Sequence, residues 1–345
     1  MKIAQLTVDH FRNHQHTTLQ LAEGVNLLVG PNAQGKTNLL EAIYLSCVGR
    51  GWRTTRDSEM VQFGQDRALV QVTAMKKFGS VEIAIQLGQG LKKSISINRV
   101  PIAKVAELMG QINCIFFSPD ELKLVKEAPA DRRRFLNIDL SQIDKSYFYA
   151  LARYNKILQQ RNAYLKDNHD PRELAIWDEQ LVKQGQIIIT KRQAFLQKLT
   201  PYVVAKHREL TGGQETIALT YETCANFAEE LAAARERDIR LRTTTVGPHR
   251  DDLAILVNGQ DVRVFGSQGQ QRTVALSIKL AELDLFSDLT GERPILLLDD
   301  VFSELDSSRQ SRLLTAIANT QAIITVTDAV GAGKIFHVLN GAVKD

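Results

Sequence analysis

The chain has 345 residues, of which 44% are hydrophobic and 24% charged, and its net charge is +4. This composition is typical of a soluble globular protein with one large or two ordinary domains. No apolar run approaches the ~20 residues that span a bilayer, and residues 1–5 lack the apolar core of a signal peptide. The three cysteines are far apart and indicate neither a disulfide framework nor a zinc site. We therefore expect a cytoplasmic protein with no membrane partner.

Alternating or continuously apolar runs predict that the first part of the chain is rich in strands. These runs cover residues 2–11, 18–21, 25–29, 68–75, 80–87, 91–100 and 112–117. Glycines separate the three runs between residues 68 and 100, which is typical of an antiparallel meander. A helix is expected over residues 38–47.

A glycine-rich segment joins the buried strand at 25–29 to this helix. It consists of Gly30, Pro31, Asn32, Ala33, Gln34, Gly35, Lys36 and Thr37, which is the full phosphate-loop pattern. The glycines permit torsions and a close approach that a Cβ would block, and the loop amides form an anion nest at a helix start. Lys36 would reach the β- and γ-phosphates, and Thr37 would offer its hydroxyl to Mg²⁺. The alternative is an ordinary glycine-rich turn, but the strand before it and the helix after it favour nucleotide binding.

The middle of the chain is expected to be helical from residue 118 to about 210. Helices are predicted at 130–138, 146–166 and 173–200, with a break at 167–171. The two longer ones form a hairpin whose arms are at most ~45 Å long. Residues 121–242 contain 21 basic and 17 acidic residues, whereas the remainder contains 22 of each. The excess positive charge is compatible with a nucleic-acid surface.

Strands and helices alternate again toward the C-terminus. Strands are predicted at 216–221, 243–246, 252–257, 260–265, 294–298, 322–326 and 335–339, and helices at 227–238, 266–285 and 307–319. Asn258 and Gly259 predict a hairpin between two of these strands.

The strand at 294–298 ends in two carboxylates. Asp299 would hold Mg²⁺, and Asp300 would lie beside the γ-phosphate and orient or activate water. The alternative is a core strand that ends in a solvated acidic turn. If Thr37 and Asp299 share one Mg²⁺, the two strands that carry them should lie side by side.

A third motif starts the helix at 266–285. Its sequence, Ser267-Gln268-Gly269-Gln270-Gln271-Arg272, resembles the signature motif of ABC-type ATPases. There the hydroxyl, the glycine amide and the helix N-terminus bind the γ-phosphate held by another subunit. The alternative is an ordinary helix capped by Ser267.

Together the three motifs resemble the ABC-ATPase head of transporters and SMC-type proteins. The resemblance implies an α/β fold: a phosphate-loop parallel core plus an antiparallel meander, with an inserted short helical arm. The expected head covers residues 1–117 and 243–345, and the arm covers residues 118–242.

Five further segments resemble the RecF family of recombination mediators. They are Phe11-Arg12-Asn13-His14, Pro119-Asp120-Glu121-Leu122-Lys123-Leu124-Val125-Lys126, Arg132-Arg133-Arg134-Phe135-Leu136, Gly247-Pro248-His249-Arg250-Asp251-Asp252 and Asp299-Asp300-Val301-Phe302-Ser303-Glu304-Leu305-Asp306. The resemblance implies an ATP- and Mg²⁺-dependent DNA-binding protein of recombinational repair and replication-fork maintenance. Such a protein dimerises with ATP on DNA, at single-strand gaps or ss/ds junctions. It would be a weak, DNA-stimulated ATPase that works with RecR and RecO, helps load recombinase and supports SOS induction at the nucleoid.

The resemblance also assigns roles to single residues. Lys36, Ser267 and Asp300 would be catalytic, and Thr37 and Asp299 would bind the metal. Nucleotide contacts outside the phosphate loop are expected from Arg12, Asn13, Ser267, Gly269, Gln270 and Asp306. Thr327 stands where transporters have a switch histidine, and no clear Q-loop glutamine precedes the arm, since Gln111 lies some way upstream. Both departures favour slow turnover.

DNA phosphates are expected to contact basic residues of the arm, without base readout. The candidates are Arg132, Arg133, Arg134, Lys156, Arg161, Lys191 and Arg192. For each one the alternative is a solvated helix face.

Three other classes of protein share parts of this pattern. A transporter subunit is disfavoured because more than two hundred residues separate the phosphate loop from the signature. An SMC- or RecN-like protein needs a far longer coiled coil than this arm. A DNA clamp that binds ATP without turnover stays open, and the role of Asp300 would decide it.

Overall fold

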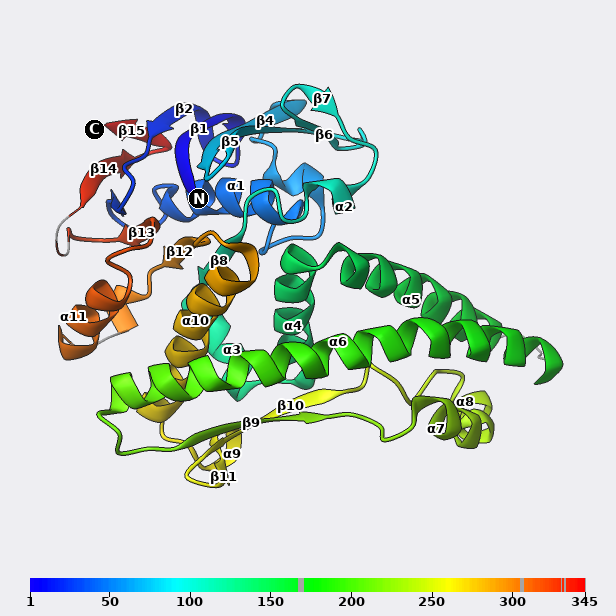
Figure 1. The fold of residues 1–345 in the computed structure, drawn as a ribbon. Coiled ribbons are helices and arrows are strands. Elements are labelled where there is room, and N and C mark those ends of the chain that lie inside the picture. Colours follow the sequence, from blue (N-terminus) through cyan, green and yellow to red (C-terminus); the bar gives the residue numbers. More distant parts are fainter. Residues whose placement is uncertain (167–170, 305–306, 330, 332, 345) are drawn as a thin grey trace. The chain divides into compact units, whose positions relative to one another are not determined.

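The computed structural model describes residues 1–166, 171–304, 307–329, 331 and 333–344 (Figure 1). The chain divides into two compact units: Met1–Glu121 with Ile278–Asp345, and Leu122–Ser277. The second unit therefore takes in residues 243–277, which the sequence assigns to the head. The reason is that β10 (Asp252–Val257) pairs along its whole length with β9 (Ile217–Glu222). None of the helices within the described ranges is long and apolar enough to cross a membrane.

The first unit contains the predicted antiparallel meander. Its sheet has the order β2-β1-β4-β5-β6-β7. The strands are β1 (Lys2–Phe11), β2 (His14–Gln20), β4 (Arg67–Lys76), β5 (Gly79–Gly88), β6 (Ser94–Ile97) and β7 (Val100–Pro101). Alternate residues of β4, such as Val70, Val72 and Ala74, are fully buried, so one face of the sheet is directed into the core.

The second sheet of this unit is the parallel core. Its order is β15-β14-β3-β13-β12-β8, with only β15 antiparallel to its neighbour. The strands are β3 (Val25–Val29), β8 (Cys114–Phe117), β12 (Ile295–Asp299), β13 (Ala322–Val326), β14 (Lys334–Leu339) and β15 (Ala342–Lys344). The prediction that the phosphate-loop strand and the Asp299 strand are adjacent is wrong, because β13 lies between β3 and β12.

Helix α1 (Lys36–Val48) links the two sheets of the first unit. It contacts β1 and β4 of the antiparallel sheet and β12 and β13 of the parallel sheet. Only Thr37 and Asn38 of its residues are not buried, which is the pattern of a helix enclosed on all sides. The remaining short elements of this unit are η1 (Asp57–Met60), α2 (Val105–Leu108), η3 (Phe302–Glu304) and α11 (Ser307–Ala316).

The second unit is largely helical, as predicted. It contains α3 (Lys123–Lys126), α4 (Pro129–Ile143), α5 (Lys145–Tyr164), α6 (Pro171–Thr211), α7 (Phe227–Ala233), α8 (Arg235–Leu241), α9 (Val262–Phe265) and the start of α10 (Gln268–Thr290); η2 (Pro119–Leu122) precedes α3. Helices α5 and α6 pack along each other as the expected hairpin. Helix α6 has 41 residues and continues through Pro201, so it is about 60 Å long rather than the predicted ~45 Å.

A three-stranded sheet, β11 (Gln260–Asp261), β10 and β9, completes this unit. Asn258 and Gly259 have φ of +50° and +79°, which forms the predicted hairpin turn. The strand predicted at 243–246 is wrong. The N–H groups of Thr244 and Thr245 donate instead to the side chains of Asn162 (2.8 Å) and Asp238 (2.9 Å).

Candidate functional site

The phosphate loop lies between the end of β3 and the start of α1, as predicted. Ala33 and Gly35 have φ of +64° and +112°, so the backbone curls at two points within the loop. A Cβ on Gly35 would lie 2.6 Å from Oδ1 of Asn13, and one on Gly30 would lie 2.2 Å from the carbonyl oxygen of Val338. Glycine is therefore favoured at position 30 by the close backbone of Val338 and at position 35 by the positive φ.

Lys36 is buried, and its ammonium group is held by the loop itself. Nζ donates to the carbonyl oxygens of Gly30 and of Pro31, the latter at 2.8 Å. Burial lowers the pKa of Lys36, while the charges of Asp300 and Asp299 oppose that shift. The positive charge is thus placed at the loop, with two carboxylates nearby.

Thr37 and Asp299 are directly connected. The Thr37 hydroxyl donates to Oδ1 of Asp299 at 2.7 Å, and the hydroxyl of Thr325 donates to the same oxygen at 2.8 Å. Burial raises the pKa of Asp299, whereas these two hydrogen bonds lower it. Thr37, at the start of α1, reaches past β13 to the end of β12, where its hydroxyl meets Asp299. The two residues therefore meet although the strands β3 and β12 are not adjacent.

Asp300 follows in a left-handed conformation, with φ of +52°. Its N–H donates to the Thr325 hydroxyl at 2.8 Å, and its side chain is exposed. Thr325 therefore contacts both aspartates, since it donates to the carboxylate of Asp299 and accepts from the backbone N–H of Asp300.

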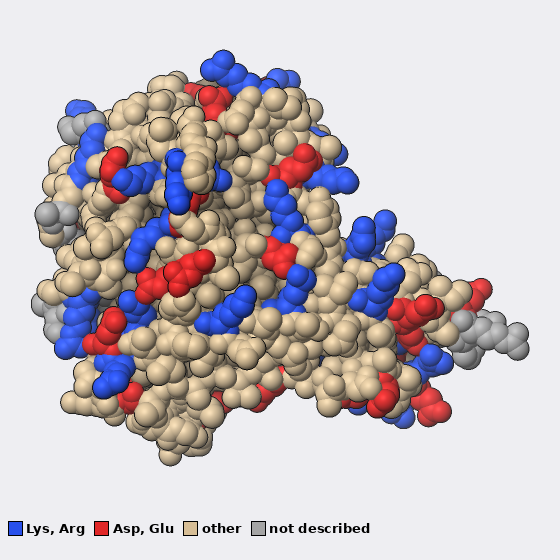
Figure 2. All heavy atoms as spheres, viewed as in Figure 1, with Lys and Arg blue, Asp and Glu red and all other residues tan. Residues whose placement is uncertain are grey.

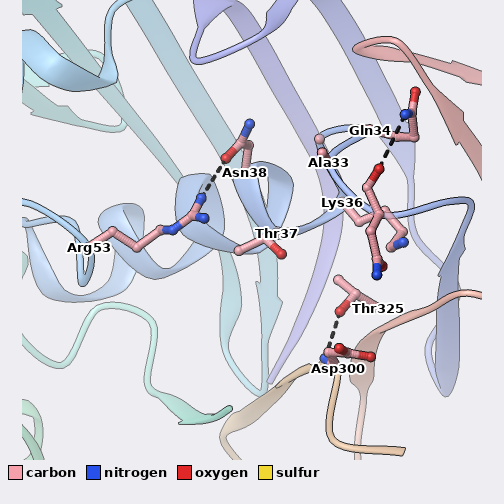
Figure 3. Close-up of a pocket in the computed structure, with 10 residues that line it drawn as sticks. Ala33, Gln34, Lys36, Thr37, Asn38, Arg53, Asp300 and Thr325 are labelled. Carbon is pink, nitrogen blue, oxygen red and sulfur yellow. Dashed lines mark hydrogen bonds between the residues drawn. The ribbon is translucent and has the colours of Figure 1, made fainter. Parts of the chain in front are cut away.

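These residues surround a cavity of about 410 Å³ (Figure 3). It is lined by Asn32, Ala33, Gln34, Gly35, Lys36, Thr37, Asn38, Arg53, Asp300 and Thr325. Figure 3 shows Lys36 and Thr37 from α1 facing Asp300 and Thr325, which come from the ends of two parallel strands. Such a cavity, with a lysine and curled backbone on one side and the Asp300 carboxylate on the other, suits an anion accompanied by a hard cation.

Arg12 and Asn13 lie beside the loop, at a second hollow of about 1100 Å³. Arg12 donates to the buried Glu41 carboxylate at 2.9 Å and to the carbonyl oxygen of Glu59 at 2.8 Å. The Asn13 amide donates to the carbonyl oxygen of Gln34 at 3.0 Å and accepts from Asn38 at 2.8 Å. Both residues are thus next to the loop, although Arg12 is paired with a carboxylate, and their contact with a nucleotide stays a prediction.

Three lining residues, Asn38, Arg53 and Thr325, were not among the predicted site residues. Arg53 donates to Asn38 at 3.0 Å, and its charge lowers the pKa of Asp299. The sequence indicates only a basic turn there. Thr325 ends a predicted strand, and a rule that the carboxyl ends of parallel strands meet at one edge would have included it. Thr327, the predicted switch position, is exposed and bonds to Asp328 at 3.2 Å.

The signature segment belongs to the second unit and begins α10. Ser267 and Gln270 bond reciprocally: the Ser267 N–H donates to Oε1 of Gln270 at 2.9 Å, and the Gln270 N–H donates to Oγ of Ser267 at 3.2 Å. This is a capping box, and it leaves the Ser267 residue exposed. Asp306, the predicted D-loop residue, lies outside the described residues.

Three of the predicted DNA-binding arginines are buried inside the second unit. Arg132 makes a bidentate pair with Asp252 (2.6 and 2.9 Å), and Arg161 pairs with Asp178 and Asp238 at 2.7 and 2.8 Å. Arg192 donates to the carbonyl oxygen of Pro248 at 2.8 Å and to Asn137 at 2.9 Å. These guanidinium groups have no surface for a phosphate, so the DNA-binding prediction does not hold for them.

The other four candidates reach solvent. Arg134 and Lys156 are exposed, Arg133 is half-buried and donates to the carbonyl oxygen of Asp251 at 2.7 Å, and Lys191 pairs with Asp144. On the face drawn in Figure 2, basic and acidic side chains are interspersed. Contact between these four residues and DNA stays a prediction.

Comparisons with known proteins identify the family. Residues 2–332 match the RecF/RecN/SMC N terminal domain. The DNA replication and repair protein RecF of Lachnospira eligens is 42% identical over 99% of both chains, and RecF of Clostridium perfringens (strain 13) is 40% identical over 100% of both.

Solved structures agree with this assignment. The recombination mediator protein RecF-ATP in RecFOR pathway matches with a TM-score of 0.93 at 36% identity, over 99% of this chain and 97% of that chain. The SmcHead bound to the C-winged helix domain of ScpA, 16% identical with a TM-score of 0.62 over 100% of this chain and 96% of that chain, shares the fold. The predicted α/β fold of an ABC-type ATPase head is thereby confirmed. The chain belongs to the RecF family of DNA replication and repair proteins.

Proposed function

We propose that this protein binds ATP with Mg²⁺ in the cavity at the phosphate loop and hydrolyses it slowly. The observation that carries the proposal is the hydrogen bond from the Thr37 hydroxyl to the Asp299 carboxylate, next to Lys36 in the sequence. A hydroxyl and a carboxylate are the oxygen ligands that Mg²⁺ takes when phosphates complete its shell. The metal would neutralise charge between the β- and γ-phosphates, while Lys36 would leave the loop carbonyls for the phosphate oxygens. The solved relative described as RecF-ATP supports the choice of nucleotide.

The second hollow is the place for the nucleoside part. It shares Asn38 and Arg53 with the phosphate cavity, and it is also lined by Arg12 and by the fully exposed ring of Phe63. A flat aromatic ring and polar groups at one hollow suit a purine base.

Slow turnover is inferred from the residues opposite the loop. Asp300 is one methylene shorter than the glutamate of transporter heads, and the exposed Thr327 offers no imidazole to the cavity. We expect a turnover number well below ~10 s⁻¹, a typical value for enzymes. An Asp300→Asn variant that binds ATP but loses turnover would separate a slow ATPase from a clamp without hydrolysis.

The exposed Ser267 and the start of α10 supply the argument for a homodimer. A phosphate loop provides donors on one side of the triphosphate, and a helix N-terminus from a second copy would provide them on the other. The dimer would close on DNA at single-strand gaps or ss/ds junctions, and DNA would stimulate hydrolysis. RecO and RecR are the expected partners in recombinase loading and SOS induction at the nucleoid, since solved relatives are described in the RecFOR pathway.

Sedimentation velocity with and without ATP and Mg²⁺, repeated with a short gapped duplex, tests this proposal. We expect a monomer without nucleotide, a dimer with ATP, and a larger complex when DNA is added. A protein that binds ATP and remains monomeric under all conditions would contradict the dimer, and one that binds no nucleotide would contradict the whole proposal.

A further inference from the structure

A buried histidine connects the end of the long arm helix to the signature helix. His207 lies in the last part of α6 and is fully buried. Its Nδ1 is 3.1 Å from Oγ of Ser277 in α10, and its Nε2 is 3.2 Å from Oε2 of Glu215 in the segment between α6 and β9. One imidazole thus touches both the signature helix and the loop that follows α6.

Glu215 extends this contact to the first turn of α10. Its other oxygen, Oε1, accepts from the side-chain amide of Gln270 at 2.9 Å. Gln270 in turn forms the capping box with Ser267. A continuous chain of polar contacts therefore runs from His207 through Glu215 and Gln270 to the exposed signature serine.

A second path runs along α10 itself. The Ser277 hydroxyl donates to the carbonyl oxygen of Thr273 at 2.7 Å, and the Thr273 hydroxyl donates to that of Gly269 at 2.9 Å. The same Ser277 hydroxyl lies 3.1 Å from Nδ1 of His207, so this path also begins at the imidazole of α6. Both paths end on the signature, one at Ser267 and the other at Gly269.

A role in packing alone does not require these residue types. A fully buried imidazole that faces a carboxylate carries a desolvation penalty, which an aliphatic side chain of similar size would avoid. Hydrogen bonds are directional, so they fix the rotation and tilt of a helix turn in a way that apolar contacts do not. A mechanism in which the first turn of α10 must be held in one orientation explains this choice of residues.

We infer that His207 and Glu215 are positioning residues through which α6 holds the signature turn of α10 ready to close on a second copy. The inference rests on the proposed ATP-dependent dimer. In this view the arm helix orients the signature segment through contacts that all lie within the second unit.

The test uses Glu215→Ala in the full chain, with Glu209→Ala as the matched control. Glu209 lies on α6 and pairs only at the surface with Lys206 in the contacts described, so its variant loses the same charge without touching α10. Glu215→Gln is the conservative variant, because its amide can still accept from Gln270 and donate toward Nε2 of His207. If Glu215→Ala folds poorly, His207→Gln is the second variant, because it also removes the contacts of the imidazole with Glu215 and Ser277.

The first readout is hydrogen exchange of the amides of residues 267–273 without nucleotide. We expect Glu215→Ala to speed this exchange by about tenfold, and Glu209→Ala and Glu215→Gln to leave it unchanged. The second readout is self-association with ATP: Glu215→Ala should raise the dimer Kd about tenfold while nucleotide affinity of the monomer stays within about twofold. A change confined to thermal stability would indicate a merely structural role.

The outcomes separate this inference from the proposed function. Unchanged exchange at 267–273 in Glu215→Ala and His207→Gln overturns the link. Faster exchange with an unchanged dimer Kd overturns its role in closure. If the parent protein fails to dimerise with ATP, the proposed function fails, and the exchange data alone decide whether the link holds the turn.

Discussion

At the scale of single residues, Lys36 gives the clearest prediction. Its ammonium group bonds only to loop carbonyls in the contacts described, so its loss should not unfold the protein. We expect Lys36→Met to abolish productive ATP binding, with affinity reduced about a hundredfold, because a hydrogen bond to a charged group contributes ~1.5–3 kcal/mol. Titration with a fluorescent ATP analogue checks this. Lys92→Met, on an exposed lysine, is the control, and equal affinities in both variants would contradict the assignment of the loop.

His249 predicts how stability depends on pH. Its Nδ1 accepts from the Tyr154 hydroxyl (2.6 Å), its Nε2 donates to the carbonyl oxygen of Thr244 (3.1 Å), and burial lowers its pKa to about 4. Between that value and ~6.5, the unfolded chain binds the extra proton, so stability rises with pH. The stabilisation is complete above pH ~6.5 and is lost as pH falls toward 4, by an amount on the order of 2–3 kcal/mol.

The measurement is urea denaturation of the parent and His249→Gln at several pH values from about 7 to 4.5. The variant should be less stable at neutral pH, and the difference should shrink in acid. Carboxylates such as Asp252 and Asp144, whose pKa values are lowered, weaken both proteins alike in acid. A difference that is constant across this range would refute the role of His249.

The predictability of single residues depended on where their partners lie. Thr37 and Asp299 were found from the sequence because each belongs to a local motif. Arg161 and Arg192 were misassigned because an arginine in a helix has the same local pattern whether it is exposed or buried. The partners that bury Arg161, Asp178 and Asp238, lie in other helices, and no local spacing indicates them.

At the scale of elements, α6 differs most from its prediction. Proline normally stops a helix, and the predicted end at residue 200 follows that rule. The helix continues because its apolar face stays buried on both sides of Pro201, at Leu199, Val203 and Leu210. Tertiary packing therefore outweighs the lost hydrogen bond, which local propensity cannot reveal. The order of the parallel strands was missed for a related reason. Buried parallel strands are all similar apolar runs, so their sequences do not indicate which strands are neighbours.

Pro201→Ala tests this account of α6. The site is exposed, so the change removes ring strain and restores one helical N–H without altering the core. We expect the free energy of unfolding to rise by about 1–3 kcal/mol. Val204→Ala, at a neighbouring exposed position, should change it by less than ~0.5 kcal/mol. A destabilised Pro201→Ala protein would mean that a kink at this point is required by the fold.

At the scale of the whole molecule, burial divides the arm's basic residues into two groups with opposite expected phenotypes. Arg134→Gln and Lys156→Gln, at exposed positions, should each reduce the salt dependence of DNA binding by about one unit, alike on all sequences. Arg161→Gln should instead destabilise the fold by about 3–5 kcal/mol, because the buried Asp238 loses the arginine it pairs with, and Asp178 keeps only its pair with Arg235. Binding isotherms at several salt concentrations and denaturation curves distinguish the two. Sequence-dependent losses would indicate base readout.

The last prediction concerns the composite site. The phosphate loop and its cavity belong to the first unit, and Ser267 belongs to the second, so a substitution at Ser267 leaves every cavity-lining residue intact. Ser267→Arg should therefore preserve ATP binding by the monomer. It should abolish ATP-dependent dimerisation and hydrolysis together, because a bulky charged side chain would replace the γ-phosphate donor at the closing face.

Two control variants show whether Ser267→Arg acts by blocking dimer closure or by removing the helix cap. Ser267→Ala removes the hydroxyl that accepts from Gln270, which costs about 1 kcal/mol of stability, and it should weaken dimerisation without abolishing it. Ser80→Arg introduces the same side chain at an exposed position of β5 and should behave like the parent. Sedimentation with ATP and steady-state hydrolysis are measured for all three. If Ser267→Arg still dimerises with ATP, the signature segment is only a capped helix, and the second side of the triphosphate must be completed by other residues.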